Sequence, residues 1–201
     1  ADSQLLTGSI LFIIASNGKL AVLAKEKKLA SYIFDPEDNP SAQPRMGSGY
    51  SLAIFWQLFK KLDLIKSQKQ PEQEFLQTIK LADRKYQPTN KNNLAKDFAY
   101  HCYDKLPIIV ASEFLSGNAH IMANQLNERA KTMANYFIIP ELNHHLLEGL
   151  TFPKKLRSRY FFIFLNSNLY QKRNQKRYLI TQQVLKKQGI ACRELKLAKG
   201  T

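Results

Sequence analysis

The chain has 201 residues, of which 44% are hydrophobic and 23% are charged, so it can bury a globular core. It contains no apolar run near the roughly 20 residues that a membrane-spanning helix needs. Cys102 and Cys192 lie too far apart for a zinc-binding spacing or a disulfide framework. We expect no secretory signal, because no basic region precedes an apolar stretch in the first residues. We therefore expect a cytoplasmic protein that has no membrane partner.

The net charge of +14 is unevenly distributed. From Pro153 onward there are 13 Lys or Arg residues and one acidic residue, Glu194, whereas residues 1–152 are nearly balanced. A basic segment of this kind either contacts nucleic acid or forms a solvated face. Because aromatic residues are not interleaved with the basic ones, we favour the solvated face and expect no nucleic-acid partner.

The first part of the chain predicts alternating strands and helices. The apolar, β-branched run 9–16 indicates a strand buried on both faces, as in a parallel sheet. A helix over 19–28 and a strand over 30–34 follow. Residues 37–49 contain several prolines and glycines, so we expect an irregular loop there. Residues 1–6 look like the tail of an incomplete helix.

The remaining pattern continues the same alternation. The expected elements, in chain order, are helices over 50–65, 72–82 and 90–104, a strand over 106–112, a long helix over about 118–136, a strand over 160–166, a helix over 175–188 and a strand over 190–197. This spacing is typical of βαβ units, so the predicted fold class is α/β, with a parallel sheet covered by helices on both faces. Both ends look like cuts through a longer protein.

The loop 43–50, Gln-Pro-Arg-Met-Gly-Ser-Gly-Tyr, is the first candidate site. Its glycines permit close approach of the backbone to a ligand, and Ser48 lies where a helix begins. The guanidinium group of Arg45 suits a phosphate or a carboxylate. An ordinary turn with a solvated arginine explains the same pattern, so the residues alone leave both interpretations open.

Glu128 is the second candidate. It lies near Leu126 and Ala134 in the expected long helix, so the periodicity does not place it on the solvent face. A carboxylate on an apolar face would have a raised pKa, which suits a general base near neutral pH. The alternative is an ordinary helical contact with Lys131 or Thr132.

The third candidate is the pair His144 and His145. We expect Pro140 to end the preceding helix and Asn143 to cap the next one. Paired histidines at a helix entry can shuttle protons, although they also occur as polar residues of a surface turn. Metal binding is the least favoured interpretation, because adjacent helical residues point about 100° apart and no third ligand is evident.

Taken together, these motifs resemble those of a known family. The run Asn-Gln-Leu-Asn-Glu-Arg-Ala-Lys at 124–131, followed by Pro-Glu-Leu-Asn-His at 140–144, resembles the paired signature of bifunctional phosphoglucose/phosphomannose isomerases, with Glu128 and His144 separated by 16 positions. Those enzymes are sugar-isomerase (SIS) domain proteins. Arg45 lies at the position of the family's Pro-Arg loop. The resemblance covers nearly the whole chain.

The resemblance implies a flavodoxin-like SIS domain, a three-layer αβα structure. Residues 1–65 would be the end of a first SIS subdomain plus an interdomain helix, and residues 66–201 would be the second, C-terminal subdomain. On this interpretation the chain is a fragment of a longer protein.

The activity implied by the resemblance is aldose–ketose isomerisation between glucose 6-phosphate and fructose 6-phosphate through a cis-enediol, without metal or organic cofactor. Mannose 6-phosphate is a further candidate substrate. Glu128 is then the general base, and His144 opens the sugar ring from the partner subunit of a homodimer. Arg45 stabilises the enediolate charge and, with Ser48, binds the substrate.

Two other functions remain open from the sequence. A non-catalytic SIS domain could bind a phosphosugar and signal to a partner, as SIS modules in transcriptional regulators do. Nucleic-acid binding through residues 154–199 would show a steep salt dependence. We favour the isomerase because the three candidate sites then have one common purpose.

Overall fold

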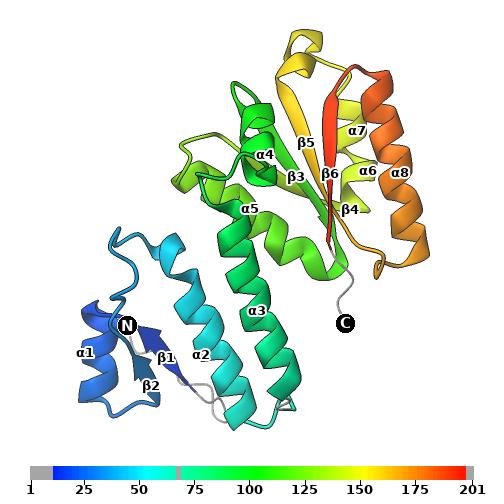
Figure 1. Ribbon diagram of the computed structural model, residues 1–201. Helices are drawn as coiled ribbons and strands as arrows, with labels where there is room; N and C mark the ends of the chain where they lie inside the picture. Colours follow the sequence, from blue (N-terminus) through cyan, green and yellow to red (C-terminus); the bar gives the residue numbers. More distant parts are fainter. Residues whose placement is uncertain (1–10, 67–68, 198–201) are drawn as a thin grey trace. The chain divides into compact units, whose positions relative to one another are not determined.

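The computed structural model describes residues 11–66 and 69–197, and the chain divides into two compact units (Figure 1). Unit 1 comprises Ala1–Gln77 and unit 2 comprises Thr78–Thr201. The helix tail predicted for residues 1–6 and the first two residues of the strand predicted over 9–16 lie outside the described residues. Each unit has its own parallel sheet.

Unit 1 contains a short β-α-β segment. β1 (Ile13–Ala15) and β2 (Ser31–Ile33) pair in parallel, and α1 (Gly18–Glu26) connects them. Gly18 has a φ of +77° at the start of α1, a conformation that glycine adopts without steric cost. The predicted strand, helix and strand are thus confirmed, with shorter bounds.

Two helices complete unit 1. The predicted loop is irregular up to Gln43 and ends in the 3-10 turn η1 (Pro44–Gly47), after which α2 (Ser48–Lys61) begins. α3 (Lys69–Tyr86) runs from unit 1 into unit 2 and is longer than the predicted 72–82. No helix in the described part of the chain has the length and apolar character needed to cross a membrane.

Unit 2 contains a four-stranded parallel sheet in the order β4-β3-β5-β6. Numbered within the unit, this order is 2-1-3-4, which is the beginning of a flavodoxin-like sheet. The elements of unit 2 after α3 are α4 (Leu94–Cys102), β3 (Leu106–Ser112), η2 (Glu113–Leu115), α5 (Ser116–Glu128), β4 (Asn135–Ile139), α6 (Glu141–His144), α7 (Leu146–Gly149), η3 (Lys154–Arg159), β5 (Tyr160–Asn166), α8 (Lys172–Lys187) and β6 (Ala191–Lys196).

Helices cover both faces of this sheet (Figure 1). On one face, Phe98 of α4 packs in a cluster with Phe161 and Ile163 of β5, where α5 also lies. On the other face, Phe164 of β5 contacts Tyr178 of α8, with ring centroids 5.6 Å apart. Successive residues of β5 therefore fill the two cores alternately. The three-layer architecture predicted from the sequence is confirmed.

The main correction concerns residues 118–136, which the sequence predicts as one long helix. α5 ends at Glu128, and Asn135–Ile139 forms β4, which pairs with β3. Between them Lys131 has a φ of +52°, which a continuing right-handed helix does not allow. Pro140 consequently follows a strand rather than a helix. Asn143 lies inside α6 and is not its N-cap.

Candidate active site

The Arg45 loop is held by its own hydrogen bonds. The buried Asn39 donates from Nδ2 to the main-chain oxygen of Gln43 at 2.9 Å and accepts from Ser41 Oγ at 2.8 Å. Ser48, the first residue of α2, donates from Oγ to the main-chain oxygen of Arg45 at 2.7 Å. Arg45 is half-buried and Ser48 is exposed. The Ser48 hydroxyl therefore fixes the junction between η1 and α2.

Glu128 is the last residue of α5, and its side chain is exposed. The expectation that it lies within a long helix is wrong, because the helix ends at this residue. Lys131 folds back over the helix end and donates from Nζ to the main-chain oxygen of Glu128 at 2.7 Å. The carboxylate is thus carried at the exposed end of a helix.

Asn127 holds the chain in the turn after Glu128. Its Nδ2 donates to the main-chain oxygens of Ala123, at 2.9 Å, and Ala134, at 2.8 Å. Its Oδ1 accepts from the main-chain N–H of Ala134 at 3.1 Å. One amide side chain therefore satisfies the backbone groups on both sides of the turn, which fixes where α5 stops and where β4 begins. The sequence pattern did not predict that Asn127 would end the helix in this way.

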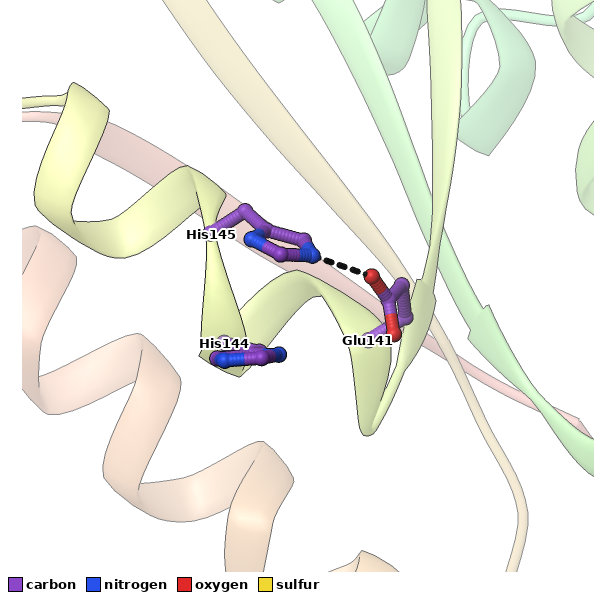
Figure 2. A group of neighbouring side chains, drawn as sticks. All are labelled: Glu141, His144 and His145. Carbon is purple, nitrogen blue, oxygen red and sulfur yellow. Dashed lines mark ion pairs between the residues drawn. The ribbon is translucent and has the colours of Figure 1, made fainter.

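His144 ends α6, and His145 lies between α6 and α7; both side chains are exposed. Their rings stack with centroids 4.2 Å apart and an interplanar angle of 25°. His145 Nε2 lies 2.6 Å from Glu141 Oε1, as Figure 2 shows. The donor atoms of these three residues lie within 4.8 Å of one another.

This arrangement corrects the geometric argument against metal binding. His145 has φ −114° and ψ −54°, where one short helix ends and the next begins, so the two histidines do not follow the regular helical rotation. Glu141 supplies the third donor, which the sequence analysis did not identify. Its i, i+4 spacing from His145 was the available signal.

The short helix α6 is fixed to the rest of unit 2 by the two residues that precede His144. Leu142 is 2% exposed and belongs to the main core cluster. Asn143 donates from Nδ2 to Oγ1 of Thr181, a fully buried residue of α8, at 2.7 Å. The backbone that carries the histidines is therefore anchored, while their rings face outward.

The structure does not bring Glu128 and His144 together within one copy of unit 2. The carboxyl ends of β3 and β4 are adjacent, since Ser112 pairs with Ile139, and both α5 and α6 begin just beyond them. α5 has 13 residues and therefore ends about 20 Å away, toward the opposite edge of the sheet. Figure 1 shows that end of α5 remote from α6. In a single copy, His144 therefore lies near the carboxyl ends of β3 and β4, and Glu128 lies toward the opposite edge of the sheet.

A cavity of about 620 Å³ lies in unit 2, and its lining includes Ala130 and Thr132 from the turn that follows Glu128. It is lined mainly by apolar side chains, among them Phe98 of α4, Leu126 of α5 and Ile163 of β5, and by none of the predicted site residues. A hexose phosphate is polar and anionic and needs several hydrogen-bonding partners. The mainly apolar lining of this cavity offers few of them. The candidate site therefore consists of exposed residues and not of this cavity.

A model of the family described as bacterial phospho-glucose isomerase C-terminal SIS domain matches residues 91–201. The chain belongs to this family. The four-stranded sheet and its covering helices are thus those of a C-terminal SIS domain.

Two curated relatives of this SIS-domain chain carry the same name, bifunctional phosphoglucose/phosphomannose isomerase. The protein from Caldicellulosiruptor bescii is 30% identical over 186 residues, which cover 89% of this chain and 52% of the relative. The protein from Aquifex aeolicus is 26% identical over 178 residues, covering 88% and 50%. The chain spans about half the length of these relatives.

A solved structure, that of a putative sugar binding protein from Salmonella typhimurium LT2, is 14% identical to this chain. It covers 53% of this chain and 30% of the solved one, with a TM-score of 0.37. A score of this size is too low to carry a structural argument.

Proposed function

We propose that the protein containing this chain interconverts glucose 6-phosphate and fructose 6-phosphate, with mannose 6-phosphate as a second candidate substrate. The observation that carries the proposal is the family match over residues 91–201. The names of the two relatives, whose similarity extends over nearly nine-tenths of the chain, support it.

In the proposed reaction, His144 donates a proton to the ring oxygen, the bond between C1 and the ring oxygen breaks, and the C1 hydroxyl loses its proton to water to give the free aldehyde. Glu128 then removes the proton from C2 of the open sugar, and a cis-enediolate forms as the C1–O1 double bond becomes a single bond. A proton passes from the C2 hydroxyl to O1, and return of the carbon-bound proton from Glu128 to C1 forms the C2–O2 double bond and gives the ketose. Arg45, with its fixed positive charge, stabilises the enediolate oxygen, and Ser48 contributes to substrate binding.

The position of Glu128 supports its role in this scheme. It is the terminal residue of α5 and is exposed, so a bound sugar can approach it. Asn127 and Lys131 hold the turn that follows, which limits the movement of the helix end. A carboxylate carried at a rigid helix end is suited to moving a proton between two adjacent carbon atoms.

The geometry also supports a homodimer. Glu128 and His144 lie at opposite edges of the sheet in one copy, so one copy of unit 2 does not place both against one hexose. We infer that His144 of one subunit acts with Glu128 of its partner. In that arrangement a two-fold axis creates two equivalent sites.

The catalytic assignment is tested by Glu128→Gln in the complete protein. Conversion of fructose 6-phosphate would be followed through the glucose 6-phosphate dehydrogenase reaction. We expect kcat to fall by about 10²–10⁴-fold, because removal of a general base costs this much. Glu148→Gln, at an exposed glutamate of α7, is the matched control and should keep full activity. Unchanged turnover in Glu128→Gln would refute the assignment.

The shared site is tested by mixing two inactive variants, Glu128→Gln and His144→Gln, after dissociation and reassociation. If each site takes one residue from each subunit, half of the dimers are mixed and each has one intact site, so about a quarter of the activity returns. No recovery would place both residues in one subunit. Binding of fructose 6-phosphate without turnover by the unsubstituted protein would instead favour a phosphosugar-sensing domain.

A further inference from the structure

The cluster of Glu141, His144 and His145 has a chemical capacity that sugar isomerisation does not use. It combines two imidazoles and one carboxylate, all exposed, with one potential donor atom from each within 4.8 Å of the others (Figure 2). Among the described residues, no other group of three His, Cys, Asp or Glu side chains has its donor atoms gathered in this way.

We propose that Glu141, His144 and His145 form a binding site for a divalent transition-metal ion, for which zinc is the best fit. Two imidazole nitrogens and a carboxylate oxygen are a ligand set that zinc accepts, with water in the fourth position. A glutamate followed three residues later by a histidine on one helix is a spacing that other metal sites also use. Calcium and magnesium, which require oxygen ligands, do not match two imidazoles.

The distances are compatible with one ion held between the three side chains. Zinc lies about 2.0–2.2 Å from nitrogen and oxygen ligands, so tetrahedral ligands are on the order of 3.4 Å from one another. The donor atoms of the cluster lie within 4.8 Å of one another, and His145 Nε2 is 2.6 Å from Glu141 Oε1. A ring nitrogen binds a metal in the plane of its ring, so the stacked His144 and His145 rings must turn toward a common ion, and both are exposed side chains that can turn.

The anchoring of α6 favours binding further. Leu142 is buried, and Asn143 is hydrogen-bonded to the buried Thr181, so the backbone of the cluster is already fixed before an ion arrives. The stacking of the His144 and His145 rings, with centroids 4.2 Å apart, also keeps the two imidazoles close to one another.

Metal binding would have a consequence for catalysis, and this part rests on the proposed function. The lone pair of a zinc-bound His144 nitrogen is no longer available to carry a proton to the sugar ring. Zinc is therefore expected to inhibit the isomerase reversibly, and a chelator such as EDTA should restore the activity.

The site is tested by titrating the metal-free complete protein with ZnCl₂ in a calorimeter, with a competing chromogenic chelator as a second readout. We expect one zinc ion per chain at this site. His145→Gln and Glu141→Gln should each weaken binding by at least about tenfold, since even the loss of a group that only supports a ligand costs 10–100-fold. Because all three side chains are exposed, these variants should keep the melting temperature.

His120→Gln is the matched control, because His120 is an exposed histidine of α5 outside the cluster. It should bind zinc as the unsubstituted protein does. Equal affinity in all variants, or loss of binding only in Cys102→Ser or Cys192→Ser, would overturn the site. Zinc that binds the cluster in a protein without isomerase activity would support the site and refute the proposed function. Zinc binding without inhibition of an active enzyme would overturn only the predicted inhibition.

Discussion

The hydrogen bond between Asn143 and Thr181 is the polar connection that holds α6, and thus His144, against α8. Asn143 Nδ2 donates to Thr181 Oγ1 at 2.7 Å, and Thr181 is fully buried. Thr181→Val keeps the shape of the side chain and removes the acceptor. It leaves the half-buried Asn143 amide without this partner.

The expected cost is about 1–3 kcal/mol, the range for a buried donor that has lost its partner. The second bond of the hydroxyl, to the main-chain oxygen of Arg177 at 2.7 Å, adds little, because that oxygen lies inside α8. For a unit of this size, each kcal/mol lowers the melting temperature by about 3–6 °C. The effect should therefore be readily measured by calorimetry or circular dichroism.

A double-mutant cycle with Asn143→Ala isolates the interaction. We expect the destabilisations of Thr181→Val and Asn143→Ala to be non-additive by about 1 kcal/mol, since the two side chains contact each other directly. Thr181→Ser retains the acceptor and is the control: its coupling to Asn143→Ala should persist. Additive effects of Thr181→Val and Asn143→Ala would refute the claim that this bond anchors α6.

Three further predictions concern the rest of unit 2. Ile109→Ala, at a fully buried position of β3, should destabilise the protein by about 2–5 kcal/mol and Ile109→Val by about 0.5–1.5 kcal/mol, as measured by urea unfolding. Asn93→Ala should cost about 1–2 kcal/mol, because the Asn93 amide accepts from two N–H groups at the start of α4 and donates to two preceding main-chain oxygens. Burial raises the pKa of the Cys102 and Cys192 thiols, so the folded protein should contain less thiolate at mildly alkaline pH and react more slowly with iodoacetamide than the unfolded protein. Equal rates would contradict that direction of the shift.

The α/β architecture could be predicted from the sequence because its central strands are buried on both faces. The runs that form β3 and β5 are almost uninterrupted apolar segments, as expected for a parallel sheet between two helical layers. The intervening helices follow from apolar residues at helical spacing. For these elements the local sequence pattern and the buried environment favour the same structure, so the predicted fold class was correct.

The strand β4 was missed because its signal is short and is not separated from α5 by glycine or proline. Tyr136-Phe-Ile-Ile139 is also consistent with the end of an apolar helix. The break is made by the side-chain hydrogen bonds of Asn127 to Ala134 and by the left-handed backbone of Lys131. Neither is evident from composition or periodicity. The position of Glu128 at a helix end depends on this break.

For the histidines, the sequence located the residues but not their mutual geometry. The stacking of His144 on His145 and the contact of His145 with Glu141 depend on the interruption between α6 and α7. A regular helix would have separated the two rings. The interruption falls at His145. Because this residue is neither glycine nor proline, the local sequence gives no signal that the helix breaks there.

The placement of Glu128 and His144 shows why sequence proximity is a poor guide to a shared site in a parallel sheet. Sixteen positions separate them, and within that interval the chain turns after the end of α5, traverses β4 and forms α6. The single crossing by β4 takes the chain from one edge of the sheet to the other, so Glu128 lies at one edge and His144 at the opposite edge. Two copies related by symmetry can bring such residues together, whereas one rigid copy does not. His144 would then have to stay exposed in each subunit to reach its partner. This same exposure makes its ring, with the side chains of His145 and Glu141 beside it, accessible to a metal ion.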